Sequence, residues 1–347
     1  MSASRNQGCN LGCVRAIRWK TPPSWALCGN DGGAFAYRGA PGCKRAVQLQ
    51  WEMRDEGGKA EMRDSIELVA TCDAAYLQPL RRTVVSCVIN NPGETFRLHV
   101  LHSTIDAGNL AAMDAFCAAV GVRFEAHAIE RAAFEGARSS KRYPQEMYYR
   151  MLAAHVLDDI DGRLLYLDPD ILVINPLRPL IETGLKGRAF AAASHLDAIH
   201  PVTGLNRIRL DTKGAYFNTG VILMDAPAAR RVVDPAELMA FAGEHDAEIV
   251  FPDQDIFNAL YGDQTVEVPD NLWNYDARKY TDYLVRTGGT STMAWVMEHT
   301  GILHYCGRDK PWNPGYRGRF DALYKNYMSI AARVDARACG ERGVCGQ

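Results

Sequence analysis

Short apolar runs alternate with stretches of helical periodicity along the chain from Ile66 onward. The runs are rich in Val, Ile, Leu and Phe and predict buried strands, and the longer stretches between them predict helices. The predicted strands are Ile66–Thr71, Phe96–His102 and Val122–Ile129, and the predicted helices run from Leu77 to about Ile89 and from the capping residue Asp106 to Val120. Strands that alternate with helices through short connections predict a parallel sheet with right-handed crossovers.

The pattern continues with a helix predicted from about Pro144 to Val156 and a buried strand that begins at Arg163. Open α/β sheets bind ligands outside the carboxyl ends of their strands. Thr71-Cys72-Asp73 follows the first strand directly and is therefore placed to meet a nucleotide. No Gly-x-Gly-x-x-Gly motif follows that strand, which argues against a dinucleotide-binding dehydrogenase.

Residues 1–61 differ from the rest, because Gly, Pro, Trp, Arg and Cys occur there without a sustained period. Up to Met62 the chain holds nine Lys and Arg against five Asp and Glu, whereas the remainder holds 30 against 36. We expect residues 1–61 to be a disordered extension or the result of a misplaced start, with the true start at Met53 or Met62. Residues 62–315 would then form one domain, and residues 316–347 a C-terminal helix and tail.

The composition is that of a folded globular protein, with 347 residues, 47% hydrophobic and 23% charged. Lys and Arg number 39 against 41 Asp and Glu, so no excess of positive charge drives binding to nucleic acid. No apolar run approaches the roughly 18 residues of a membrane helix, and no export signal is recognisable. We therefore predict a cytoplasmic protein with no nucleic-acid partner.

Ten cysteines are many for such a protein, and four of them lie in the first 60 residues. Cys72, Cys87 and Cys117 lie in apolar surroundings that suit buried thiols. The N-terminal cysteines lack the second close pair that a zinc site needs, and the chain is long for a disulfide framework.

The sequence Asp168-Pro169-Asp170 follows the strand that begins at Arg163, and a second apolar run comes directly after it. In an extended chain the two carboxylates would share one face and repel each other unless a cation lay between them. A divalent metal that carries a phosphate ligand would satisfy them. The alternative is a polar turn between two strands, because Asp and Pro are turn residues.

A second signal lies far downstream, where His304 is predicted in a strand and is followed by Gly307 and Lys310. One His and two Asp make a mixed nitrogen and oxygen site that suits Mn²⁺ and tolerates Mg²⁺. Gly307 lets the backbone approach a diphosphate closely, and Lys310 can neutralise it. Taken alone, His304 would be read as a core histidine, and the two signals together favour a metal site.

These residues resemble glycosyltransferase family 8, most closely its bacterial lipopolysaccharide and lipooligosaccharide α-galactosyl- and glucosyltransferases. The resemblance covers Ile66 to about Trp312 and rests on several motifs in order. They are Ala70-Thr71-Cys72-Asp73, Tyr148-Tyr149-Arg150, Asp168-Pro169-Asp170, Asn218-Thr219-Gly220-Val221, Asp253-Gln254-Asp255 and the stretch from His304 to Trp312.

The resemblance implies a GT-A fold, an α/β domain with a Rossmann-like, nucleotide-binding mixed sheet flanked by helices. It implies transfer of galactose or glucose from a UDP-sugar to a saccharide acceptor, with retention of configuration and with Mn²⁺ or Mg²⁺. The implied metal ligands are Asp168, Asp170 and His304. The implied donor contacts are Ala70, Thr71, Asp73, Arg150, Asp168, Gly307 and Lys310, and Asn218, Asp253 and Gln254 would face the sugar.

For the retaining step we favour attack from the face of the leaving group, with Gln254 as an electrostatic helper, because a neutral amide is a poor nucleophile. The alternative is a double displacement with Asp253 or Asp255 as nucleophile. The departing phosphate oxygen can accept the proton of the acceptor in the favoured route.

Several positions depart from the family pattern. Cys72 lies where close relatives often carry an acidic residue, and His195 lies where the galactosyltransferases carry Asp. The loop Leu196–Gly214 is expected to face the acceptor. In the C-terminal region an amphipathic helix with Phe320 and Tyr324 is expected to pack on the surface, with weak peripheral contact to the inner membrane as the alternative.

Three other readings fit parts of the pattern. A HAD-type phosphatase would carry its Asp-x-Asp after the first strand, which is not the case here. A non-catalytic nucleotide-sugar binder would be favoured by a degenerate metal triad, but all three residues are present. A UDP-sugar hydrolase that uses water as acceptor stays open.

Overall fold

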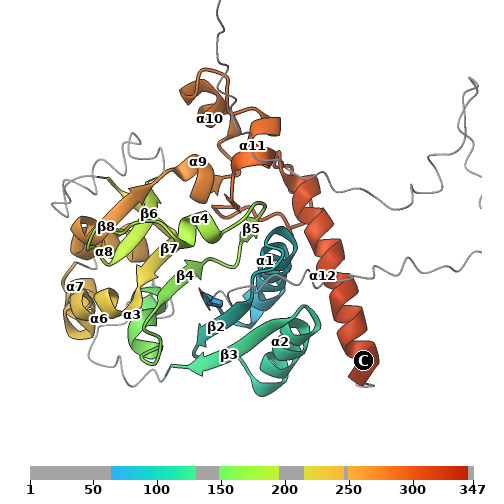
Figure 1. Cartoon of the computed structure of the whole chain (residues 1–347), viewed down its shortest axis with the longest axis horizontal. Coiled ribbons are helices and arrows are strands. Elements are labelled where there is room, and N and C mark those ends of the chain that lie inside the picture. The colour runs from blue at the N-terminus through green and yellow to red at the C-terminus, as the bar shows by residue number, and fades with distance from the viewer. Residues whose placement is uncertain (1–63, 130–147, 195–214, 246–248, 343–347) are drawn as a thin grey trace, which may run out of the picture. The chain divides into compact units, whose positions relative to one another are not determined.

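The computed structural model describes residues 64–129, 148–194, 215–245 and 249–342 (Figure 1). The chain divides into two units, Met1–Lys59 and Ala60–Gln347, and everything below concerns the second. The expected extension 1–61, His195 and the loop Leu196–Gly214 lie outside the described residues. Among the described helices, none combines the length and the apolar character that crossing a membrane requires.

The main sheet has seven strands in the order β3-β2-β1-β4-β7-β6-β8. Its strands are β1 (Ile66–Thr71), β2 (Phe96–His102), β3 (Val122–Ala128), β4 (Arg163–Leu167), β6 (Phe190–Ser194), β7 (Phe217–Asp225) and β8 (Thr265–Val268). The first four strands in space are parallel, as the alternation of strands and helices predicts. β7 runs antiparallel to both β4 and β6, so the sheet is mixed.

Helices cover both faces of this sheet because successive residues of its strands point to opposite sides. Leu68 packs into a core with α1 and α2, whereas Val69 packs into a second core with α3, α6, α7 and α8. These helices are α1 (Leu77–Asn90), α2 (Ala107–Ala119), α3 (Tyr149–Val156), α6 (Ala226–Val232), α7 (Pro235–Glu244) and α8 (Pro252–Tyr261). Asp106 caps α2 by accepting a hydrogen bond from the backbone N–H of Asn109.

A second sheet of three strands, in the order β5-β10-β9, extends the main one. Its strands are β5 (Ile171–Val173), β9 (Tyr275–Asp276) and β10 (Ile302–His304). Four short helices surround them, namely α4 (Arg178–Ile181), α9 (Asp270–Trp273), α10 (Tyr280–Arg286) and α11 (Met293–His299). β4 and β5 are consecutive in the chain but belong to different sheets, so the turn that joins them lies where the two sheets meet.

The last helix, α12 (Asp321–Arg342), lies beside α1 and α2 (Figure 1). The side chain of Asn90 donates a hydrogen bond of 2.6 Å to the Tyr327 hydroxyl, and Arg81 forms an ion pair of 2.7 Å with Asp335. Tyr324 is fully buried in the core that α1 shares with the sheet. The expected surface helix is therefore packed on the domain through its aromatic face.

The predicted elements agree with the structure to within a residue or two where both are described. Cys72, Cys87 and Cys117 are buried thiols, as their surroundings predict. Two expectations need correction. The purely parallel winding ends at β4, and Asp168 and Asp170 do not continue an extended strand but form a turn.

Candidate active site

A cavity of about 810 Å³ opens where the carboxyl end of β4 meets β7, β10 and the start of α8. Its walls carry mostly polar and charged side chains. They are Arg150, Asp168, Asp170, Tyr216, Asn218, Thr219, Gly220, Phe251, Asp253, Gln254, Arg278, Lys279, His304, Cys306, Gly307 and Lys310. The cavity therefore gathers nine of the candidate residues from five separate segments of the sequence.

The Asp168-Pro169-Asp170 turn is attached to both sheets. The backbone N–H of Asp168 donates to the carbonyl of Gly220 in β7 at 2.8 Å, and the N–H of Tyr305 donates to the carbonyl of Asp170 at 3.0 Å. The hydroxyl of Thr83 lies 3.1 Å from the carbonyl oxygen of Pro169, beneath the turn. The segment therefore fits both interpretations of its sequence. It is a polar turn between two strands, and its two carboxylates still lie close to the same histidine.

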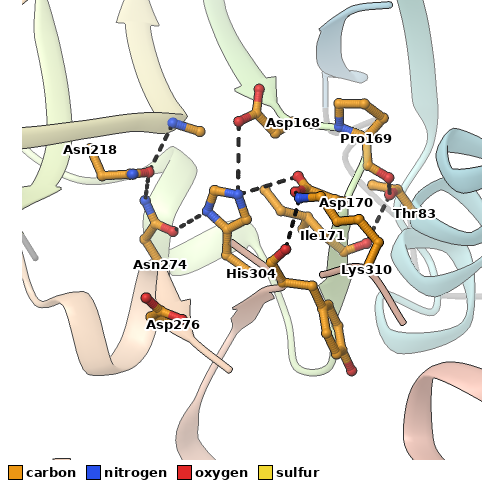
Figure 2. A network of polar contacts seen from close by, with 12 residues as sticks. Thr83, Asp168, Pro169, Asp170, Ile171, Asn218, Asn274, Asp276, His304 and Lys310 are labelled. Atoms are coloured by element: carbon orange, nitrogen blue, oxygen red, sulfur yellow. Dashed lines mark hydrogen bonds and ion pairs between the residues drawn. The ribbon is translucent and has the colours of Figure 1, made fainter. Parts of the chain in front are cut away.

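His304 stands between these carboxylates at the end of β10 (Figure 2). Its Nε2 lies 3.2 Å from Asp170 Oδ1 and 3.8 Å from Asp168 Oδ2. The three side chains could hold one metal ion, and two carboxylates with one imidazole are a donor set that suits Mn²⁺.

Gly220 makes room for this group. A Cβ atom at this position would lie 2.2 Å from His304 Cε1 and 2.8 Å from Asp168 Oδ2. Only a residue without a side chain lets β7 approach the cluster so closely. The glycine of the Asn218-Thr219-Gly220-Val221 motif therefore has a steric role that the sequence did not reveal.

A chain of hydrogen bonds fixes the orientation of His304 (Figure 2). The backbone N–H of Gly220 can only donate, and it does so to Asn218 Oδ1 at 3.0 Å. The Asn274 amide then donates its Nδ2–H to the same oxygen at 2.8 Å, which leaves Asn274 Oδ1 to accept from His304 Nδ1–H at 2.8 Å. His304 is thereby held in the form that carries a proton on Nδ1 and turns Nε2 toward the two aspartates.

The two carboxylates have different cationic partners. Arg150 Nη1 lies 3.2 Å from Asp168 Oδ1, and Lys310 Nζ is paired with Asp170 Oδ2. Burial raises the pKa of Asp168 despite Arg150, whereas His304 and Lys310 outweigh burial and lower the pKa of Asp170. Burial opposes protonation of His304, but neighbouring Cys306 and Asp170 raise its pKa well above the usual value. Positive charge therefore collects around these carboxylates.

The cavity-lining side chains that are predicted to face a sugar come from β7 and α8. Asn218 Nδ2 donates to Gln254 Oε1 at 2.7 Å, so the same asparagine contacts both Gln254 and Asn274. Asp253 Oδ2 accepts from the Thr219 hydroxyl at 2.6 Å and lies 2.8 Å from Arg150 Nη1.

Asp255 differs from its neighbour Asp253, because it is fully buried. Its Oδ2 accepts the backbone N–H groups of Val250 and Phe251 at 2.7 and 2.9 Å, and its Oδ1 accepts from the Tyr216 hydroxyl. Asp255 is also absent from the walls of the cavity. Its carboxylate shapes the entry to α8 and does not face the site.

The candidate residues at the end of β1 and just after it lie outside the cavity walls. Ala70 is buried in the core, and Asp73 caps the turn Ala74–Tyr76 by accepting from the N–H of Ala75 at 2.9 Å. Thr71 is linked to the cluster indirectly, because its hydroxyl lies 3.0 Å from the Tyr166 hydroxyl, which donates to Asp168 Oδ1 at 2.7 Å.

Several residues at or beside the site carry no recognisable signal in the sequence, chiefly Tyr166, Asn274, Arg278 and Lys279. Asn274 follows α9 in a segment without any motif, and its amide reaches His304 only because β9 pairs with β10. Tyr166 reads as one more apolar residue of a buried strand. No sequence signal at either position distinguishes a site residue from a core or loop residue.

Known proteins resemble this chain over most of its length. The model of glycosyl transferase family 8 matches residues 67–314. General stress protein A of Bacillus subtilis is 26% identical over 276 residues, 77% of this chain and 94% of that protein. Glycosyltransferase GlyF of Streptococcus pneumoniae is 28% identical over 78% of this chain but only 62% of its own length. The lipopolysaccharide 1,2-glucosyltransferase of Escherichia coli K12 is 23% identical over 70% of this chain and 71% of that enzyme.

Among solved structures, galactosyltransferase LgtC superposes with a TM-score of 0.64 at 21% identity, over 76% of this chain and 96% of LgtC. The mixed sheet flanked by helices is thus a GT-A-like fold. The family model spans the whole described site, from β1 to the segment after Lys310. The chain belongs to glycosyl transferase family 8.

Proposed function

We propose that this protein transfers a hexose, galactose or glucose, from a UDP-sugar to a saccharide acceptor with retention of configuration and with Mn²⁺ as cofactor. One observation carries the proposal. The side chains of Asp168, Asp170 and His304 converge on the wall of a cavity that Asn218, Asp253 and Gln254 also line. Relatives named as lipopolysaccharide glucosyltransferases and a 1,3-galactosyltransferase support an acceptor in lipopolysaccharide or another cell-surface glycan.

In this proposal Asp168, Asp170 and His304 Nε2 hold the metal ion. When bound, the ion supplies positive charge that stabilises a diphosphate leaving group. Lys310 lies beside Asp170 at the same end of the cavity, where its ammonium neutralises further charge on the diphosphate. Gly307 has a φ of 89°, which favours glycine, and its lack of a side chain lets the backbone approach the diphosphate closely.

Ala70, Thr71 and Asp73 are proposed to contact the nucleoside, because they lie at the end of β1 or just after it, at the carboxyl edge of the parallel strands. The hydrogen bonds from Thr71 through Tyr166 to Asp168 connect this edge to the metal ligands. Arg150 is also proposed to contact the donor, because its guanidinium group bridges Asp168 and Asp253 at the cavity wall.

The contacts of the two candidate nucleophiles favour attack from the leaving-group face. Asp255 is occupied by backbone N–H groups and Tyr216, away from the cavity. Asp253 faces the cavity, but Arg150 and Thr219 bind its Oδ2 and reduce its nucleophilicity. Gln254 is held by Asn218 with its Oε1 already accepting a hydrogen bond, and it stabilises positive charge on the sugar as a dipole.

The test is UDP release from UDP-galactose and UDP-glucose, with and without Mn²⁺, in the presence of saccharide acceptors. We expect metal-dependent release that disappears in Asp170→Ala, and an NMR spectrum of the product with the anomeric configuration of the donor. An inverted product would contradict the retaining mechanism. Release that no acceptor accelerates would support the hydrolase alternative, and the absence of both binding and release would overturn the proposal.

A further inference from the structure

A second cavity, of about 730 Å³, adjoins the active-site cavity. We call it the arginine pocket, because Arg278, Arg308, Arg317 and Arg319 line it against a single carboxylate, Asp309. Its remaining walls are Ala277, Tyr280, Thr281, Cys306, Gly307, Gly315, Tyr316 and Gly318. This density of positive charge is local, since the whole chain carries a formal charge of −2.

The four guanidinium groups are not equivalent. Arg278 is fixed by a two-point contact with buried Asp276, with Nε 2.9 Å from Oδ1 and Nη2 2.6 Å from Oδ2. Arg319 lies over the ring of Tyr280, 4.3 Å from its centroid. Within the described part of the chain, no carboxylate forms an ion pair with Arg308, Arg317 or Arg319. Exposed like charges that lack counter-charges repel one another, so the pocket favours an anion.

The pocket and the active-site cavity share one wall. Arg278, Cys306 and Gly307 line both. Arg278 lies so close to Gly307 that a Cβ there would be 2.5 Å from its Nη1. A molecule that extends from the active site past Gly307 therefore enters the field of all four arginines.

We propose that the arginine pocket binds a phosphate group of the acceptor, so that the acceptor is an anionic saccharide. This inference rests on the proposed function and specifies its acceptor. Guanidinium groups match the geometry of phosphate oxygens with paired N–H donors. The diphosphate of the donor would have its own cations in the other cavity, namely Lys310 and the metal ion that the proposed ligands would hold. A neutral saccharide would leave three guanidinium groups without an anionic partner.

The test uses the full chain loaded with Mn²⁺ and UDP, so that the diphosphate site is filled, and titrates galactose and galactose 6-phosphate calorimetrically. We expect the phosphate to tighten binding by at least about tenfold, since hydrogen bonds to charged groups are the strong ones. Arg317→Ala/Arg319→Ala should remove this advantage. The control Arg333→Ala/Arg337→Ala removes two exposed arginines from α12 and should retain it. Arg308→Ala tests the same pocket if the double variant does not fold.

Equal affinity for galactose and its phosphate, or an equal loss in the control variant, would overturn the inference. It would also be wrong if the arginine substitutions weakened binding to phosphatidylglycerol vesicles and left the sugar phosphate unaffected, because the pocket would then belong to a membrane contact. UDP binding and acceptor-free UDP release should be unchanged in the pocket variants. A failure of those two readouts in the unmodified protein would instead contradict the proposed function.

Discussion

In the described part of this protein, two clusters of histidine and carboxylate side chains could hold a metal ion by composition alone. The turn cluster consists of Asp168, Asp170 and His304, and the sheet cluster of His99 in β2 with Glu125 and His127 in β3. Both bring their ligand atoms within 4.8 Å of one another. They differ in what surrounds these atoms, and that difference favours the turn cluster as the candidate metal site.

The ligand atoms of the sheet cluster already have protein partners. His99 Nε2 lies 2.8 Å from Glu67, and its Nδ1 lies 3.1 Å from His127 Nε2, so each of these nitrogens has a protein partner. Arg123 Nε lies 2.7 Å from Glu125 Oε1, so this carboxylate also has a protein partner. None of its residues lines either of the two cavities described above.

In the turn cluster, His304 is oriented by residues that do not belong to the cluster. The hydrogen bonds from Gly220 through Asn218 and Asn274 reach the far nitrogen of His304 and leave Nε2 facing two carboxylates at a cavity wall. We therefore propose the turn cluster as the metal site, because its histidine tautomer is fixed and its ligand atoms face an open cavity.

The largest expected effect is that of Asp170→Asn, which keeps the size of the side chain and removes its charge. Turnover should fall by about a hundredfold to a thousandfold, because a charge that stabilises the leaving group is lost with the metal. Metal-dependent UDP release measures it. Asp282→Asn changes an exposed aspartate and serves as the control. A variant with near-normal, metal-dependent activity would show that Asp170 is not a ligand.

Gly220→Ala should displace His304 and abolish metal binding, because the new Cβ would collide with the imidazole. We expect an added loss of about 1–3 kcal/mol in the free energy of unfolding from overpacking. Gly243→Ala in α7 is the matched control, since a Cβ there meets nothing within 4 Å. Retained metal affinity in Gly220→Ala, measured by calorimetry, would refute the steric role of this glycine.

Asn274→Ala should lower Mn²⁺ affinity by about 10- to 100-fold, as expected for the loss of a side chain that orients a metal ligand. Asn274→Asp can still accept from His304 Nδ1–H but cannot donate to Asn218. It should restore most of the metal affinity and still reduce kcat through Asn218 and Gln254. If both variants lost metal affinity equally, Asn274 would have only a structural role.

The smallest effect concerns the sheet cluster. Burial and neighbouring His99 lower the pKa of His127, so the unfolded chain binds this proton more readily than the folded protein does. Stability should therefore fall as the pH drops through the ordinary histidine range near about 6.5. His127→Gln should flatten this dependence in urea unfolding measured at several pH values and leave Mn²⁺ affinity unchanged. A loss of metal affinity would reverse the comparison.

Much of the fold could be predicted because periodicity reports burial. The bounds predicted for Ile66–Thr71 and Phe96–His102 equal those of β1 and β2. The antiparallel insertion of β7 could not be predicted in this way, because a strand buried on both faces has the same pattern in either direction.

The site was predictable where a residue type is rare in its setting, as with Asp168, Asp170 and His304 at the ends of apolar strands. Asn274 and Gly220 act only through contacts that strand pairing creates. Residues 70–73 show the opposite limit, since a motif places Asp73 near the ligand edge whereas local geometry engages its carboxylate in a turn. Backbone hydrogen bonds of this kind are not visible in a motif.

We propose above all that the turn cluster binds the metal ion that helps to bind the diphosphate of a nucleotide sugar. The most direct test is a Mn²⁺ titration followed by electron paramagnetic resonance, with UDP present, on the unmodified chain, Asp170→Asn and His127→Gln. We expect one UDP-dependent Mn²⁺ site that Asp170→Asn abolishes and His127→Gln retains. A site that survives Asp170→Asn, or that disappears with His127→Gln, would contradict it.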